Sequence, residues 1–262
     1  MSTASHTKGG FGGSIRASAS RTKGLSALPV ARQVLVWATV ILVIVGWIVT
    51  LAGSPLTLSA PALWMGVAAC ATSVLACAGY ASRRQWLVVA VGVVANLAIG
   101  YVANSVTIPF YFDTIGTMGA TIAGGPLAGL TTAVLTNAAE SFQDPVLMAF
   151  TISNMIAAMS AWLLLVSRRA HRVVWLIIGG VVIGAITGFL GGVKAVQVYG
   201  SSGRHGIDSV VYILALNGTD VPTWNMTLSV LSDVLDKVVS LFVAAAVLGL
   251  FGMLSDRQDF AD

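Results

Sequence analysis

Long apolar runs separated by short polar turns make up most of this chain. About 20 helical residues, each rising ~1.5 Å, cover the ~30 Å hydrocarbon core of a bilayer. Runs of that length predict membrane-spanning helices at residues 33–52, 61–82, 86–107, 146–166, 173–198 and 226–254. The pattern therefore predicts a helical membrane bundle, whose first two helices form a hairpin closed by Arg83 and Arg84.

The stretch 104–140 breaks this pattern. Asp113 directly follows an aromatic run, and the Gly-Gly-Pro sequence at 124–126 divides the remainder into two short apolar pieces. Short, Gly/Pro-interrupted apolar segments that carry polar groups are the best sequence indicator of a transport site. We expect two short helices joined by a turn at Gly-Gly-Pro, which would bring Asp113 to the same end of the bundle as Asn137 and Glu140.

Composition supports a membrane protein. Of 262 residues, 56% are hydrophobic and only 9% are charged, and the mean hydropathy is +0.88. Soluble domains carry about 25% charged residues. The predicted fold class is therefore all-α, a polytopic membrane helical bundle. The pattern of apolar runs divides it into an N-terminal hairpin over residues 32–84 and six further helices over 85–254, two of them short.

The sequence lacks the residue motifs of several common functions. The sequence has no HExxH motif, no CxxC motif and no Cys/His cluster, so we expect neither a metal site nor a cofactor. Residues 188–194 superficially resemble a phosphate-binding loop but lack its Gly-Lys-Ser/Thr end, so the chain is not expected to be an ATP-hydrolysing enzyme. Cys70 and Cys77 lie seven residues apart in one apolar helix and are expected to act as small hydrophobic residues.

Basic residues indicate the orientation. Under an eight-helix alternation, 11 of the 14 basic residues fall on the side of both termini, which predicts a plasma-membrane protein with cytoplasmic ends. Residues 1–31 are expected to be a disordered basic tail, although a transit peptide shares that composition. Residues 255–262 form a second tail, and 199–225 are the longest loop, facing outward.

Polar residues gather in the outer half of the predicted bundle. Buried ionisable groups cost about 2.5–3.5 kcal/mol each on insertion scales, so they must face a cavity or each other. This distribution predicts a water-accessible pocket open to the outside. The residues concerned are Asp113, Asn137, Glu140, Asn154, Lys194, Gln197, Asp233, Asp236 and Lys237.

Each of these signals also has a purely structural interpretation. Asp233 and Lys237 have the i,i+4 spacing of an intrahelical ion pair, and Lys194 could pair with an acid inside the bundle. Asn137 and Asn154 could hold helices together, and Trp224 fits either an interfacial belt or a lid over a ligand.

A strict ladder of glycines at every fourth position marks residues 180–192. Its members are Gly180, Gly184, Gly188 and Gly192. The spacing creates a flat groove along one helix face, so that another backbone can approach closely. The favoured interpretation is packing within the molecule.

The segment NSVTIPFYFDTIGTMGATIAGGPLAGLTTAVLTN resembles the "PFFLDTIGT…GPW.GA..G..TN" pattern of substrate-binding S components of energy-coupling factor (ECF) transporters. The segment SDVLDKVVSLFVAAAVLGL is similar to the "DK..S" last helix of that family. The resemblance covers about residues 86–254 and implies an S-component-like core of six helices, to which the N-terminal hairpin is an addition.

The resemblance implies a mechanism. An S component captures a vitamin-like solute from outside and delivers it inward with a membrane T component and two cytoplasmic ATPases, which use the ATP. Family members dock through small residues on the first core helix, which here gives Gly92, Ala95 and Ala103. The candidate solute-binding residues are Asp113, Thr117, Asn137, Glu140, Asn154, Lys194, Trp224, Asp233 and Asp236.

The predicted function is therefore the specificity subunit of an ECF-type importer. Two alternatives stay open at this point. Similar segments occur in membrane sensor domains, so a ligand-sensing or scaffolding module is the second. A proton-coupled secondary carrier that uses Asp233 and Asp236 is the third, and it ranks last because the chain lacks the duplicated halves that many such carriers show.

Overall fold

The computed structural model describes residues 25–53, 60–105, 110, 112–166, 173–200, 205–216, 218 and 220–258. Every regular element in these ranges is a helix. The α-helices are α2 (Val30–Ala52), α3 (Ala60–Cys77), α4 (Arg83–Ser105), α5 (Ile115–Gly124), α6 (Pro126–Glu140), α7 (Thr151–Val166), α8 (Val173–Tyr199), α9 (His205–Ala215) and α10 (Val221–Gln258). Two 3₁₀ segments, η1 (Leu25–Ala27) and η2 (Pro145–Phe150), precede α2 and α7.

Within the residues that the structure describes, four helical stretches are long and apolar enough to cross a membrane. They are Val30–Ala52, Arg83–Ala103, Pro145–Leu164 and Val173–Tyr199. Their outward faces carry large apolar side chains, among them Trp37, Val94 and Phe189, which suit contact with lipid. The chain is thus an all-α membrane protein, as its composition predicts.

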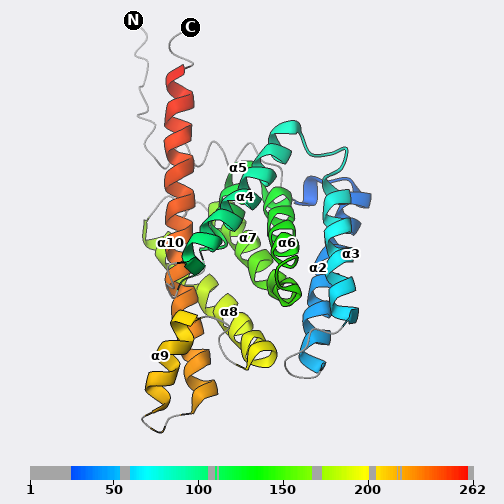
Figure 1. Ribbon diagram of the computed structural model, residues 1–262. Helices are drawn as coiled ribbons and strands as arrows, with labels where there is room; N and C mark the ends of the chain where they lie inside the picture. The colour runs from blue at the N-terminus through cyan, green and yellow to red at the C-terminus, as the bar shows by residue number, and fades with distance from the viewer. Residues whose placement is uncertain are drawn as a thin grey trace, which may run out of the picture.

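The two short helices lie in the interior. Gly125 has φ 88° and Pro126 follows it at the first position of α6, so the chain reverses there as the Gly-Gly-Pro sequence predicts. Most residues of both helices are buried, because α3, α4, α7 and α10 pack around them (Figure 1). Their neighbours shield α5 and α6 from lipid, so neither needs the length of a spanning helix.

The glycine ladder of α8 packs against α10, which confirms the favoured interpretation. A Cβ added at Gly180 would lie 2.6 Å from the Cα of Val238, and one at Gly184 would lie 2.4 Å from the Cα of Val234. Only glycine permits this approach of the two backbones. The contact holds α10 along one side of the bundle, opposite α2 and α3 (Figure 1).

The predicted N-terminal hairpin is formed by α2 and α3. The two helices share a hydrogen bond between the hydroxyls of Thr39 and Thr72, 2.8 Å apart. α3 in turn contacts α6, where Thr131 Oγ1 lies 3.1 Å from both Ser73 Oγ and Cys77 Sγ. Both cysteines are free, and α3 packs them toward α6 as the small residues that the sequence predicts.

The region 199–225 differs from the loop expected there. α9 occupies residues 205–215, and its Val211 is buried while Tyr212 and Ile213 are exposed. α10 already begins at Val221, because Asp220 Oδ2 accepts hydrogen bonds from the backbone N–H and the hydroxyl of Thr223. These bonds hold the pKa of the Asp220 carboxyl below its usual value.

The terminal segments are also more helical than expected. η1 and the first residues of α2 fall inside the predicted tail 1–31, and α10 continues to Gln258, within the predicted tail 255–262. Residues 1–24 and 259–262 lie outside the described part, so the prediction of disorder is not tested there.

Candidate functional site

A cavity of about 310 Å³ lies at one end of the bundle. We call this the cavity end: the last turns of α4 and α6, the second half of α8, the first turn of α7 and the middle of α10 all contribute to the lining. The cavity is lined by Leu97, Gly100, Tyr101, Asp113, Asn137, Ala139, Glu140, Gln143, Leu147, Phe150, Ser153, Asn154, Thr187, Gly188, Gly191, Gly192, Ala195, Tyr199, Ser229, Asp233 and Lys237.

The division of 104–140 into two helices brings its polar ends together. Asp113, just before α5, and Asn137 and Glu140, at the end of α6, all line the cavity, as the sequence predicts. Asn96 of α4 fixes the start of α5, because its Oδ1 accepts from the backbone N–H of Gly116 at 2.6 Å. The Nδ2 of Asn96 also donates to Thr117 Oγ1 and to Thr136 Oγ1 of α6.

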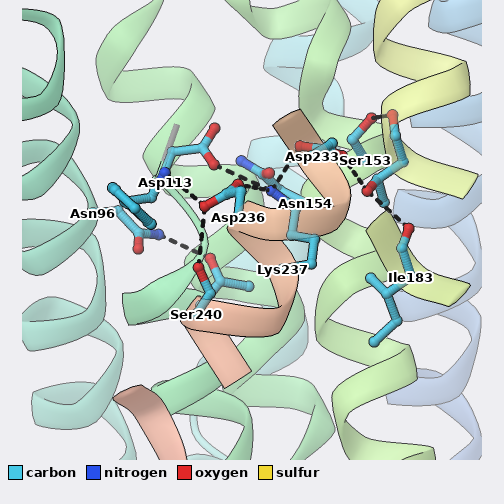
Figure 2. A network of polar contacts seen from close by, with 12 residues as sticks. Asn96, Asp113, Ser153, Asn154, Ile183, Asp233, Asp236, Lys237 and Ser240 are labelled. Atoms are coloured by element: carbon cyan, nitrogen blue, oxygen red, sulfur yellow. Dashed lines mark hydrogen bonds and ion pairs between the residues drawn. The ribbon is translucent and has the colours of Figure 1, made fainter. Parts of the chain in front are cut away.

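Three carboxylates converge on one lysine at the cavity wall (Figure 2). Lys237 Nζ lies 2.5 Å from Asp236 Oδ2, 3.2 Å from Asp233 Oδ1 and 3.6 Å from Asp113 Oδ1. We call Asp113, Asp233, Asp236 and Lys237 the acidic cluster. The predicted i,i+4 pair of Asp233 and Lys237 is therefore present, within a larger network that also joins α10 to the start of α5.

The members of the acidic cluster differ in their access to the cavity. The side chain of Asp113 is 23% exposed, that of Asp233 is 9% exposed and that of Asp236 is fully buried. Asp233 also accepts a hydrogen bond from the hydroxyl of Thr187 on α8. Asp113 is thus the cluster carboxylate most open to a bound molecule, and Asp236 is a buried support.

Asn137 and Asn154 fasten helices together while they line the cavity. Asn154 Nδ2 donates to Asn137 Oδ1 at 2.7 Å, and Asn137 Nδ2 donates to the carbonyl oxygen of Leu147 at 2.9 Å. These bonds tie α6 to η2 and α7. They support the interpretation of the two amides as links between helices.

Four predicted solute-binding residues lie outside the lining of the cavity. Thr117 accepts a hydrogen bond from Asn96, and Asp236 is fully buried against Lys237 without lining the cavity itself. Lys194 Nζ donates to the carbonyl oxygen of Trp47 at 2.9 Å and lies 5.0 Å from the centre of the Trp47 ring, so it ties α8 to the hairpin. Trp224 is half-buried on α10 and does not contribute to the cavity wall.

The small residues expected to form a docking surface on α4 are largely used inside the molecule. A Cβ added at Gly92 would lie 2.9 Å from the carbonyl oxygen of Gly116, so Gly92 serves the contact of α4 with α5. Ala103 is 4% exposed, and Ala95 is half-buried. Gly92 and Ala103 are thus buried within the chain, and the docking role of the three residues stays a prediction.

Three aromatic residues line the cavity that the sequence did not predict there. Tyr101, Phe150 and Tyr199 all line the cavity, and the rings of Phe150 and Tyr199 stack with their centres 6.4 Å apart. The hydroxyl of Tyr199 donates to Asp144 Oδ2 at 2.6 Å. Their positions in the sequence could have indicated this, because each aromatic residue lies near the last residue of α4, η2 or α8.

The described residues of the cavity wall combine charged, polar and aromatic side chains. They supply carboxylates, one ammonium group, amides, hydroxyls and aromatic rings. Within the described ranges no group of three or more metal-ligating side chains is found. No family model matches the chain, and no curated protein or solved structure matches it either.

Proposed function

We propose that this chain is the solute-binding subunit of an ECF-type importer, which captures a small vitamin-like molecule outside the cell. The observation that carries the proposal is the cavity at one end of the bundle. Its volume is that of a small-molecule site. Three of its four charged lining residues come from the two segments that resemble S components: 104–137 contributes Asp113, and 232–250 contributes Asp233 and Lys237.

The proposed orientation gives the cavity access to the outside. Basic residues concentrate on the side of both termini, which favours a cytoplasmic location for that side of the plasma membrane. The cavity end is the opposite one.

The energy for transport would come from partner proteins. The chain has no phosphate-binding loop, so we assign ATP hydrolysis to two cytoplasmic ATPases and the coupling to a membrane T component. The fully buried Lys237–Asp236 pair supports a bundle that can move as a unit with its solute, because α10 and the start of α5 are joined through it.

Purification of the tagged protein from its native membranes in mild detergent tests this proposal. We expect a T component and two ATPases to co-purify, and we expect ATP-dependent uptake when the set is reconstituted into proteoliposomes. A tagged polytopic protein of unrelated function from the same membranes is the control. Recovery with a kinase or a response regulator would favour sensing instead, and uptake driven by a pH gradient without partners would favour a secondary carrier.

A further inference from the structure

We infer that the solute carries a positively charged ammonium group, which the cavity holds by its carboxylates and aromatic rings. This inference rests on the proposed function, because it names the chemical class of the captured molecule. It is carried by the charges that face the cavity, by their accessibility and by the three aromatic side chains of the wall.

The described side chains that face the cavity carry more negative than positive formal charge. Asp113, Asp233 and Glu140 line it, and Lys237 is the one cation among the lining residues of the described chain. That lysine is already held by Asp236 at 2.5 Å, behind the wall. In the described part of the chain, four carboxylates therefore line or support the cavity wall, together with one ammonium group. An enclosed site with an excess of one sign of charge concentrates ions of the opposite sign.

The second lysine of the membrane region does not offset this excess. Lys194 is fully buried, and it is directed away from the lining toward Trp47 on the hairpin, where it bonds the backbone carbonyl oxygen. Among the described lining residues, an anionic solute would thus meet Asp113 and Glu140, with Lys237 as the one cation that attracts it. A cationic solute would find the most exposed carboxylate of the acidic cluster, Asp113.

The aromatic wall indicates an organic cation rather than a bare metal ion. Tyr101, Phe150 and Tyr199 line the same cavity as the carboxylates. The faces of aromatic rings attract ammonium groups within about 6 Å. A volume of about 310 Å³ also exceeds the space that one ion occupies and suits a molecule with an apolar body.

The charge preference can be measured without knowing the solute. Cys70 and Cys77 are the two cysteines of the sequence, so Cys70→Ala with Cys77→Ala gives a thiol-free background. Ser153→Cys then places one thiol in the cavity wall, and Leu216→Cys, at a position 70% exposed after α9, is the control. Each protein is treated with 2-(trimethylammonium)ethyl and with 2-sulfonatoethyl methanethiosulfonate, and the two rates are compared.

We expect the cationic reagent to modify Ser153→Cys at least about tenfold faster than the anionic reagent, relative to their rates with a free thiol in solution. The ratio at Leu216→Cys should be near that of the free thiol. Asp113→Asn or Glu140→Gln, added singly, should each lower the ratio at position 153. If Asp113→Asn fails to fold, Glu140→Gln and the unaltered cavity still decide the question.

A matched pair of probes extends the test to reversible binding. 2-Phenylethylammonium should slow the modification of Ser153→Cys, and 3-phenylpropionate, of similar size but negative charge, should not. Equal rates for the two reagents, or stronger protection by the anion, would overturn the inference. Absence of any reaction at position 153 would mean a cavity closed to water, which contradicts the inference and the proposed function together. If the cavity selects cations but no T component or ATPases co-purify, the inference about the charge of the ligand is supported and the proposed importer function is contradicted.

Discussion

The carboxylate of Asp236 accepts a hydrogen bond from the backbone N–H of Phe112, with 2.8 Å between nitrogen and Oδ1. Phe112 has φ 50°, a conformation that bulky residues rarely adopt. Strain of this kind costs of order 1–3 kcal/mol, and a hydrogen bond to a charged group offsets a similar amount, about 1.5–3 kcal/mol. Asp236 therefore fixes the turn that presents Asp113 to the cavity.

Asp236→Ala should lower the free energy of unfolding by about 1–3 kcal/mol, because the backbone N–H of Phe112 loses its acceptor. It also removes one of the three carboxylates around Lys237. The measurement is thermal unfolding in detergent micelles. Asp236→Asn keeps a side-chain acceptor for the Phe112 N–H but loses the charge. Its free energy of unfolding should therefore lie between those of the wild type and Asp236→Ala. Unchanged unfolding of Asp236→Ala would show that the cluster is not a structural support.

Gly116→Ala should destabilise the protein by about 1–3 kcal/mol, the usual cost of overpacking. The added Cβ would lie 2.0 Å from the carbonyl oxygen of Gly92 and 2.7 Å from Asn96 Oδ1, so α4 and α5 would have to separate. Gly119→Ala is the matched control on the same helix, since nothing lies within 4 Å of its Cβ position. Equal melting temperatures for the two variants would contradict the close contact of α4 with α5.

Gly184→Ala should separate α8 from α10. Its Cβ would lie 2.4 Å from the Cα of Val234 and 2.6 Å from the carbonyl oxygen of Asp233, and backbone atoms cannot rotate away. We expect a loss of about 1–3 kcal/mol in stability. Gly191→Ala, on the same helix, meets only Ser153 Oγ at 3.9 Å and should unfold at the temperature of the wild type. Similar losses in both would argue against specific packing by the ladder.

Lys194→Gln should loosen the N-terminal hairpin without changing solute binding. The substitution removes the cation that bonds the Trp47 carbonyl near the end of α2, while the cavity keeps its lining. Hydrogen exchange of residues 47–53 should accelerate by about threefold or more, since local opening reports lost contacts. Lys194→Arg retains a cation and should exchange more slowly than Lys194→Gln. A large loss of solute binding in Lys194→Gln would show that Lys194 does contribute to the solute site.

Much of the fold follows from the sequence because apolar length and helix breakers act locally. Gly125 and Pro126 set the reversal between α5 and α6 by their own backbone preferences. Region 199–225 was misjudged because α10 starts with a cap at Asp220, and α9 is stabilised by burial of Val211. Local hydrophobicity alone underestimates a short helix whose partner lies elsewhere in the chain.

The sequence predicted how far along its helix each site residue lies, but not which face of the helix carries it. Position along a helix places Asp113, Asn137, Glu140, Asn154 and Asp233 at the cavity end, and these residues do line the cavity. The same argument cannot tell which face of α8 carries Lys194, because α8 contacts α7, α10 and η2 at once. The rotation of a buried helix depends on all of its neighbours, so the directions of Lys194 and Asp236 emerge only in the folded bundle.

Native mass spectrometry of the gently purified protein tests most directly whether the cavity holds a small solute. The wild type should carry a non-covalent small molecule. Gly191→Trp should lose it, because its side chain would fill the cavity where only Ser153 Oγ is near. Leu163→Trp, at a 64% exposed position of α7, should keep it. A wild type without any bound molecule, or Gly191→Trp that retains the same one, would contradict a solute site in this cavity.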